Sequence, residues 1–272
     1  MNGFVVVTKE SSVCRFDRLL ELRSKMGWVY GSEDLCVLLY SLVKRTRPRV
    51  MVELGTGFGV TTAWVAAAMK ETGVGTLYTY DNASHFKSEA GRRFASGLDG
   101  ALANLLNRDD GPSSYLDFVA ALLVWAGVDG PVAQVEGDID LKKIAAAPYL
   151  DPGVDCVFSD FSHSPESIQS LLGAFLGRLR PTASIFIDSA STQRLSYLTL
   201  ERIVDDLNQN KLPIGILAGC TEAEVSALVR KVQCSRFRLM HLIEDRQRAQ
   251  NSTAWLSVEP VDVVPTSAAF LH

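Results

Sequence analysis

Short apolar runs alternate along the chain with stretches whose apolar residues recur at helical spacing. Each run of four to eight residues, rich in Val, Ile and aromatic side chains, is typical of a buried strand. Strands are predicted at 49–54, 76–81, 131–138, 154–160 and 183–188, and helices at 15–27, 33–45, 60–71, 114–126, 140–147, 165–178, 194–208 and 221–233. Five strands that alternate with helices predict an α/β fold, a parallel sheet covered by helices on both faces.

Three segments depart from this alternation. Residues 82–112 are polar and irregular, and they are long for a plain connection, so we expect an insertion or lid there. The apolar stretch 212–219 fits neither pattern. At the end of the chain, 237–244 and 253–260 predict two antiparallel strands joined by a polar loop.

Composition, net charge and cysteine spacing limit the cellular location and the classes of partner that we expect. The 272 residues are 47% hydrophobic and carry a net charge of -4, so we expect no broad basic surface and no nucleic-acid partner. The five cysteines form no C-x-x-C pair, which favours reduced thiols. Residues 1–12 lack a signal-peptide layout, and the apolar stretch 118–128 is too short to span a bilayer. We therefore expect a cytoplasmic protein without a membrane partner.

Every predicted parallel strand ends in or beside an acidic residue. These residues are Glu53, Asp81, Asp138, Asp160 and Asp188. In parallel sheets ligands bind at the carboxyl ends of the strands, so the five carboxyl groups should meet at one edge. Acids also favour turns and helix starts, and that preference explains a single acid better than the whole set.

The turn after the first strand is glycine-rich. Its glycines are Gly55, Gly57 and Gly59, whereas the dinucleotide fingerprint G-x-G-x-x-G needs a glycine at Val60. No Gly-Lys-Ser/Thr follows, so the phosphate-binding loop is absent as well. The acid at Glu53 would repel a phosphate and attract an ammonium group.

Two further strand-end acids define the ligand. Asp81 ends the second strand, where a carboxylate grips a ribose diol in this topology, and Asp138 could accept the amino group of an adenine. An adenosine ligand with a cationic amino-acid tail meets these demands together with Glu53. That ligand is S-adenosylmethionine.

At these residues the chain resembles the class I S-adenosylmethionine-dependent methyltransferases. The matching motifs are E-L-G-T-G-F-G at 53–59, Y-D-N at 80–82, E-G-D-I at 136–139 and D-C-V-F-S-D at 155–160. The resemblance implies a Rossmann-like sheet of seven strands in the order 3-2-1-4-5-7-6, with the last strand antiparallel. It also implies a role for each site residue. Glu53 would hold the methionine amino group, and the close turn would be formed by Gly55, Thr56, Gly57 and Gly59. Asp81 and Asn82 would bind the ribose, Asp138 and Ile139 would flank the adenine, and Asp160 would border the cofactor.

The acceptor end of the predicted site lies at 159-SDFSHSPES-167. Asp160 and Asp188 end neighbouring strands and could share a magnesium ion, which would lower the pKa of a bound hydroxyl group. His163 follows three residues after Asp160 and could accept the proton. This D-x-x-H arrangement resembles the metal-dependent O-methyltransferases of catechol and macrolide-sugar type. Those families follow the strand-five acid with Asn or Asp, whereas this chain has Ser189, a weaker metal ligand.

The favoured function is therefore methyl transfer to a hydroxyl group of a small molecule. The alternatives are a metal-independent N- or protein-methyltransferase and a catalytically silent protein that binds the cofactor. We expect a helical segment at 1–31 that covers the site, a methyltransferase domain at 32–260 and a tail at 261–272. Trp28 and Tyr30 could line the acceptor pocket. The acceptor itself and the oligomeric state, with a homodimer as one option, stay open.

Overall fold

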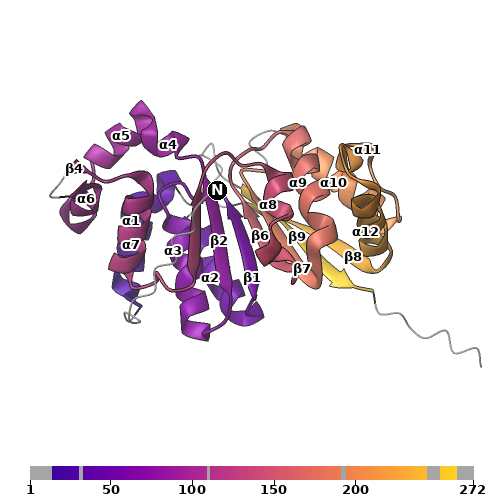
Figure 1. Ribbon diagram of the computed structural model, residues 1–272, viewed down its shortest axis with the longest axis horizontal. Helices are drawn as coiled ribbons and strands as arrows, with labels where there is room; N and C mark the ends of the chain where they lie inside the picture. Colours follow the sequence, from indigo (N-terminus) through magenta and orange to yellow (C-terminus); the bar gives the residue numbers. More distant parts are fainter. Residues whose placement is uncertain (1–13, 31–32, 109–110, 191–193, 244–251, 262–272) are drawn as a thin grey trace, which may run out of the picture.

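The computed structural model describes residues 14–30, 33–108, 111–190, 194–243 and 252–261. Figure 1 shows a central sheet with helices on both of its faces. Its seven strands lie in the order β5-β2-β1-β6-β7-β9-β8, and β9 runs antiparallel to both of its neighbours. Their bounds are β1 Val50–Leu54, β2 Thr76–Asp81, β5 Val132–Glu136, β6 Val154–Ser159, β7 Leu179–Asp188, β8 Ser235–Ile243 and β9 Ser252–Pro260. Counted along the main sheet, this is the order 3-2-1-4-5-7-6, which confirms the fold expected from the sequence.

The helices form two layers against this sheet. One face is covered by α2 and α3, with α1 and α7 packed beside α3, and the other by α8, α9, α10 and α12. Their bounds are α1 Phe16–Tyr30, α2 Glu33–Thr46, α3 Val60–Thr72, α7 Tyr115–Ala126, α8 Leu141–Ala145, α9 Pro165–Phe175, α10 Arg194–Asn208 and α12 Glu222–Gln233. None of the helices in the described part of the chain has the length and apolarity that crossing a membrane requires.

Strand β1 shows how the sequence alternation fixes the two layers. Val52 and Leu54 pack in the cluster that contains α9 and α10, whereas Met51 packs against α2 and α3. Side chains alternate between the faces of a strand, so Glu53 must point to the same side as Met51. A carboxyl group is thereby placed in the apolar layer under α3.

The segment 82–112 is not irregular as its sequence suggested, and its role as an insertion or lid stays a prediction. It contains α4 Ser84–Lys87, α5 Glu89–Ser96 and α6 Gly100–Leu106, followed by a two-strand ladder of β3 Asn107–Arg108 and β4 Gly111–Pro112. These helices have one or two turns each, too short for a visible apolar period. Ser88 ends one helix and caps the next, because its hydroxyl accepts a hydrogen bond from the Gly91 amide at 2.9 Å.

Smaller corrections concern the second half of the chain. The unassigned stretch 212–219 contains the one-turn helix α11, Ile214–Leu217. Strand β7 begins at Leu179 instead of residue 183, because its first residues include the exposed Pro181 and Thr182, which hide it from an apolar pattern. The helix predicted at 165–178 ends at Phe175, and a 3-10 turn completes that range (η2, Leu176–Arg178); another, η1, covers Pro148–Leu150.

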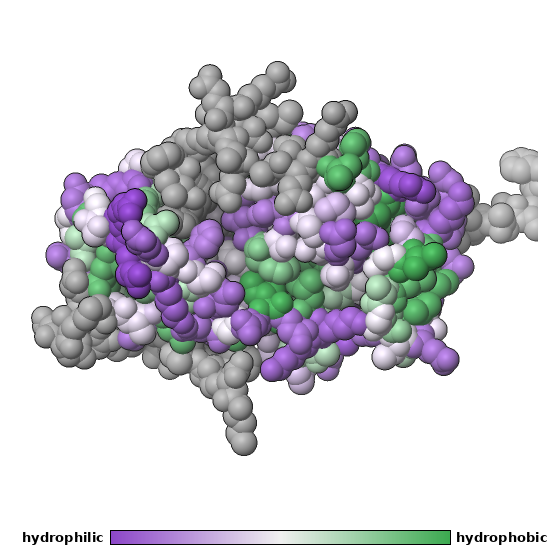
Figure 2. Space-filling view, turned by 90° about the horizontal axis from the view of Figure 1, so that it is seen from above, coloured by the Kyte–Doolittle hydropathy of each residue, from purple (hydrophilic) through white to green (hydrophobic). Residues whose placement is uncertain are grey.

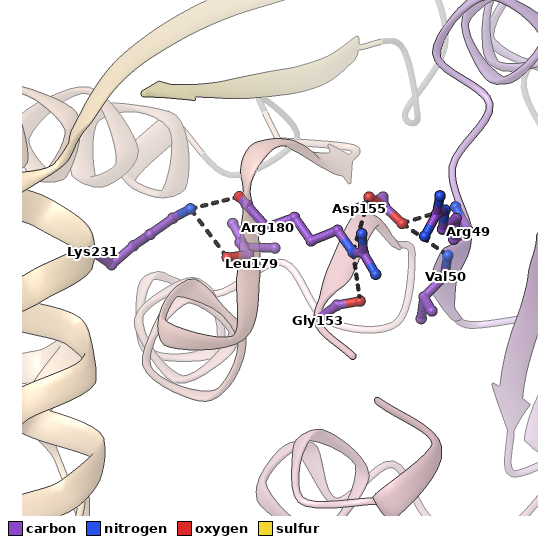
Figure 3. A network of polar contacts seen from close by, with 7 residues as sticks. All are labelled: Arg49, Val50, Gly153, Asp155, Leu179, Arg180 and Lys231. Atoms are coloured by element: carbon purple, nitrogen blue, oxygen red, sulfur yellow. Dashed lines mark hydrogen bonds and ion pairs between the residues drawn. The ribbon is translucent and has the colours of Figure 1, made fainter. Parts of the chain in front are cut away.

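The amino ends of three parallel strands are tied together by a polar network (Figure 3). The Asp155 carboxylate accepts hydrogen bonds from the backbone amides of Arg49 and Val50, at 2.8 and 2.9 Å, and lies 3.4 Å from Arg180. From α12, the half-buried Lys231 ammonium donates to the carbonyl oxygens of Leu179 and Arg180, at 3.1 and 2.6 Å. Burial lowers the pKa of Lys231 to about 8. Lys231 therefore anchors α12 to the start of β7.

Replacing Lys231 by Met should destabilise the fold, because two partly buried carbonyl oxygens lose a charged donor. We expect the free energy of unfolding to fall by about 1–3 kcal/mol in urea denaturation. The control is Lys211→Met, since the ammonium group of Lys211 is exposed and donates to the side chain of Gln209 as its one hydrogen-bond partner among the described residues. Equal stability of the two variants would contradict the anchoring role.

Candidate active site

The carboxyl ends of β1, β2 and β6 enclose a pocket of about 510 Å³. Eight of the residues predicted from the sequence line it: Gly55, Thr56, Gly57, Asp81, Asn82, Ile139, Asp160 and His163. Four others, Glu53, Gly59, Asp138 and Asp188, are not among the lining residues. Thr61, Ser84, His85 and Phe161 complete the wall. The sequence analysis did not name Ser84 and Phe161 as site residues. Each follows a strand end within three residues and stands close to an acid of the site, and this position could have identified it.

The glycine turn brings β1 against the end of β6. At Gly55 the backbone has φ 97°, and an added Cβ atom would lie 2.4 Å from the Asp160 carbonyl oxygen. Only glycine tolerates both the angle and this close approach. At Gly57 the φ angle is 54°, and a Cβ atom would meet nothing within 4 Å, which leaves the backbone open to the pocket.

Asp81 holds the turn in place. Its carboxylate accepts hydrogen bonds from the backbone amides of Gly57 at 2.9 Å and Ala83 at 2.6 Å. Asn82 similarly accepts from the Ser84 amide at 2.9 Å. Asp81 thus links the glycine turn to α4, and it still lines the pocket. An acid fixed by two amides is preorganised for a second set of donors such as ribose hydroxyls.

Glu53 lies beneath the pocket wall. Its side chain is 1% exposed and accepts hydrogen bonds from the hydroxyl groups of Thr62 and Thr79, at 2.6 and 2.5 Å. Burial raises the pKa of Glu53 to about 7, and the nearby Asp81 adds to the increase, while the two hydroxyl donors oppose it. A positive ligand charge above the turn would favour the ionised form.

Asp160 and Asp188 meet at the ends of β6 and β7. Burial and the charge of Asp188 raise the pKa of Asp160 well above its usual range. Burial also raises the pKa of Asp188, opposed by hydrogen bonds from Thr253 at 2.9 Å and Ser189 at 3.0 Å. Two acids that approach without a counter-cation cannot both ionise cheaply.

His163 lies beside this pair. Its Nε2 atom is 3.8 Å from the Asp160 carboxylate, and its Nδ1 atom is buried without a hydrogen-bond partner among the described residues. Burial lowers the pKa of His163, and Asp188 partly offsets this. The imidazole is therefore neutral near pH 7 and able to accept a proton.

The donor set does not fit a resident magnesium ion. Both Asp188 oxygens accept hydroxyl hydrogen bonds, and Ser189 directs its hydroxyl to Asp188. Within the described residues no three or more His, Cys, Asp or Glu side chains form a group that could hold a metal ion. Mg²⁺ is commonly held by one or two carboxylates and several waters, but here both oxygens of one of the two acids, Asp188, already accept hydroxyl hydrogen bonds.

Comparison with known proteins identifies the family. A family model described as "Methyltransferase domain" matches residues 52–190, just over half of the 272-residue chain. The chain therefore belongs to this family. With the strand order above, it is a class I S-adenosylmethionine-dependent methyltransferase. A search of curated protein sequences finds no match.

Solved structures share the fold. The chain is 17% identical to the O-methyltransferase TomG from Streptomyces achromogenes, involved in tomaymycin synthesis and solved with S-adenosylmethionine; the TM-score is 0.50 over 94% of this chain and 92% of that chain. It is 15% identical to an O-methyltransferase from Bacillus cereus solved with S-adenosylhomocysteine, with a TM-score of 0.50 over 94% of each chain. At these identities the likeness concerns the fold.

The positions of two aromatic side chains predicted to line the acceptor pocket are not described by the structure. Trp28 and Tyr30 belong to α1, but their side chains fall outside the described residues, so their role at the acceptor pocket stays a prediction. Asp138 is exposed, while its neighbour Ile139 lines the pocket.

The Gly55→Ala substitution should distort the site, because its new methyl group would collide with the Asp160 carbonyl. We expect a loss of at least about 2 kcal/mol in the free energy of unfolding, measured by urea denaturation. The matched control is Gly57→Ala, whose methyl group meets open space and should cost only about 1 kcal/mol. A smaller loss at Gly55 than at Gly57 would show that the close approach is not a constraint.

Proposed function

We propose that this protein transfers the methyl group of S-adenosylmethionine to a hydroxyl group of a small molecule. The observation that carries the proposal is the placement of His163 and Asp160 in the wall of the pocket that holds the glycine turn. In this arrangement a neutral base borders the pocket where the fold class binds its methyl donor.

The charge of the pocket supports the cofactor. Asp81 and Asp160 line it, Glu53 and Asp188 lie behind it, and no lysine or arginine is among the described residues that line it. The ammonium and sulfonium groups of S-adenosylmethionine supply the missing positive charge. In the proposed binding mode Asp81 and Asn82 bind the ribose, Ile139 contacts the adenine, and Glu53 attracts the ammonium group through the turn.

The proposed reaction is a direct displacement. The acceptor oxygen attacks the methyl carbon, the carbon–sulfur bond breaks, and its electron pair remains on sulfur as S-adenosylhomocysteine. His163 takes the proton of the acceptor hydroxyl, and the charge of Asp188, which raises the pKa of His163, stabilises the imidazolium that forms. Holding the acceptor oxygen in line with the sulfonium contributes the rest of the rate enhancement.

The direct test uses a panel of phenols, catechols, sugars, amines and small proteins, with S-adenosylhomocysteine formation as the readout. We expect turnover that depends on a hydroxylated small molecule. Methylation confined to amines or proteins would favour the N- or protein-methyltransferase alternative. Tight cofactor binding without any turnover would indicate a catalytically silent protein.

His163→Gln should lower kcat by about 10²–10⁴-fold with little change in cofactor affinity, because the general base is lost. In the wild type, activity should fall as the pH drops through the lowered pKa of His163, since protonation removes the base. The variant should lack this acidic limb. The control is His241→Gln, since His241 stacks on Tyr197 at 4.0 Å and does not line the pocket. An unchanged kcat would remove His163 from the mechanism.

A magnesium-assisted reaction is the rival mechanism, favoured by the resemblance of Asp160 and Asp188 to metal-binding acids. The two mechanisms differ in their response to a chelator. Because the donor set is poor, we expect turnover with the identified acceptor to be unaffected by EDTA. Loss of turnover with EDTA and recovery with added magnesium would establish the metal-assisted reaction instead.

A further inference from the structure

A second cavity, of about 590 Å³, lies among the short helices of the 82–112 segment. Its lining includes Phe86 and Lys87 from α4, Arg92 from α5, Leu98 and Leu106 around α6, and Ser113. None of the described residues lines both this cavity and the cofactor pocket. Its size and mixed lining are those of small-molecule sites, which pair apolar walls with a few polar groups.

The cavity has a rigid apolar side. Phe86 contacts the rings of Phe58, Tyr115 and Phe118, with centroid distances between 5.5 and 5.6 Å. All three partners are buried in the cluster of α1, α3 and α7. Because Phe86 is held from behind, the wall that it presents cannot collapse into the cavity.

Among the described residues that line the cavity, the two with charged side chains, Lys87 and Arg92, are both cations. Lys87 is paired with Glu136 at 2.6 Å, but Glu136 is not part of the lining. Arg92 has no ion-pair partner in the part of the chain that the structure describes, whereas the adjacent Arg93 pairs with Glu89 at 2.7 Å. Within the described residues, the cavity wall therefore carries an exposed guanidinium group that has no ion-pair partner and lies next to apolar side chains.

Helix α4 separates this cavity from the cofactor pocket. Ser84 and His85 line the cofactor pocket, while Phe86 and Lys87 line the second cavity. Figure 2 shows that hydrophilic residues gather at the left end of the upper face, where α4, α5 and α6 lie in Figure 1.

We propose that this cavity is a second binding site, for an organic anion with an apolar body. Its carboxylate or phosphate pairs with Arg92, whose planar fork suits either group, and Lys87 adds positive charge. The apolar body packs along Phe86, Leu98 and Leu106. The site does not depend on the proposed methyl transfer.

The test is isothermal titration calorimetry of the full chain with decanoate and with decyl phosphate, both in saturating S-adenosylhomocysteine. We expect one-to-one binding of at least one of them, and weaker binding of the neutral match decan-1-ol. Arg92→Gln should weaken anion binding by about tenfold or more, because a charge-assisted hydrogen bond is lost. Arg93→Gln is the matched control and should bind as the wild type does, since Arg93 does not line the cavity.

A second variant fills the cavity without changing its charge. Ala103→Phe, from the α6 side of the wall, should also weaken binding. The proposal is overturned if neither anion binds, if Arg92→Gln binds like the wild type, if decan-1-ol binds as tightly as the anions, or if saturation with S-adenosylhomocysteine abolishes binding. None of these outcomes bears on methyl transfer.

Discussion

Four carboxyl groups converge at one edge of the sheet, and the described residues of the pocket wall include no lysine or arginine to neutralise them. Glu53, Asp81, Asp160 and Asp188 end or nearly end four parallel strands, so the topology itself brings them together. Burial and mutual repulsion raise the pKa values of Glu53 and Asp160. Hydroxyl and amide donors offset part of the free-energy cost of ionising these buried acids, and a cationic ligand would offset the rest.

The backbone around these acids is shaped by the same requirement. Gly55 lets the end of β1 approach the end of β6 so closely that a methyl group would collide with Asp160. Asp81 binds the turn through Gly57 and reaches α4 through Ala83. A distortion at the glycine turn would therefore reach both the cofactor side and the proposed catalytic side of the pocket.

The sequence predicted the sheet well because buried parallel strands are continuous apolar runs. It also predicted four of the acids that cluster, since strand ends share an edge, whereas the fifth, Asp138, is exposed and lies two residues beyond the end of β5. It could not show that Glu53 lies under the wall, because that depends on the face to which Met51 and Glu53 point and on Thr62 and Thr79 across the layer. The segment 82–112 escaped for a different reason: each of its helices is too short to show an apolar period, and the cavity there depends on three of them packing together.

The central claim is that these acids await a positively charged cofactor. Calorimetric titration of S-adenosylmethionine at pH 7, repeated in two buffers with different ionisation enthalpies, measures both binding and the protons exchanged. We predict binding with a net release of protons, because the cofactor lowers the raised pKa values of the buried acids. Release should be smaller for S-adenosylhomocysteine, which lacks the sulfonium charge. Absence of binding, or the same proton exchange for both ligands, would contradict the account.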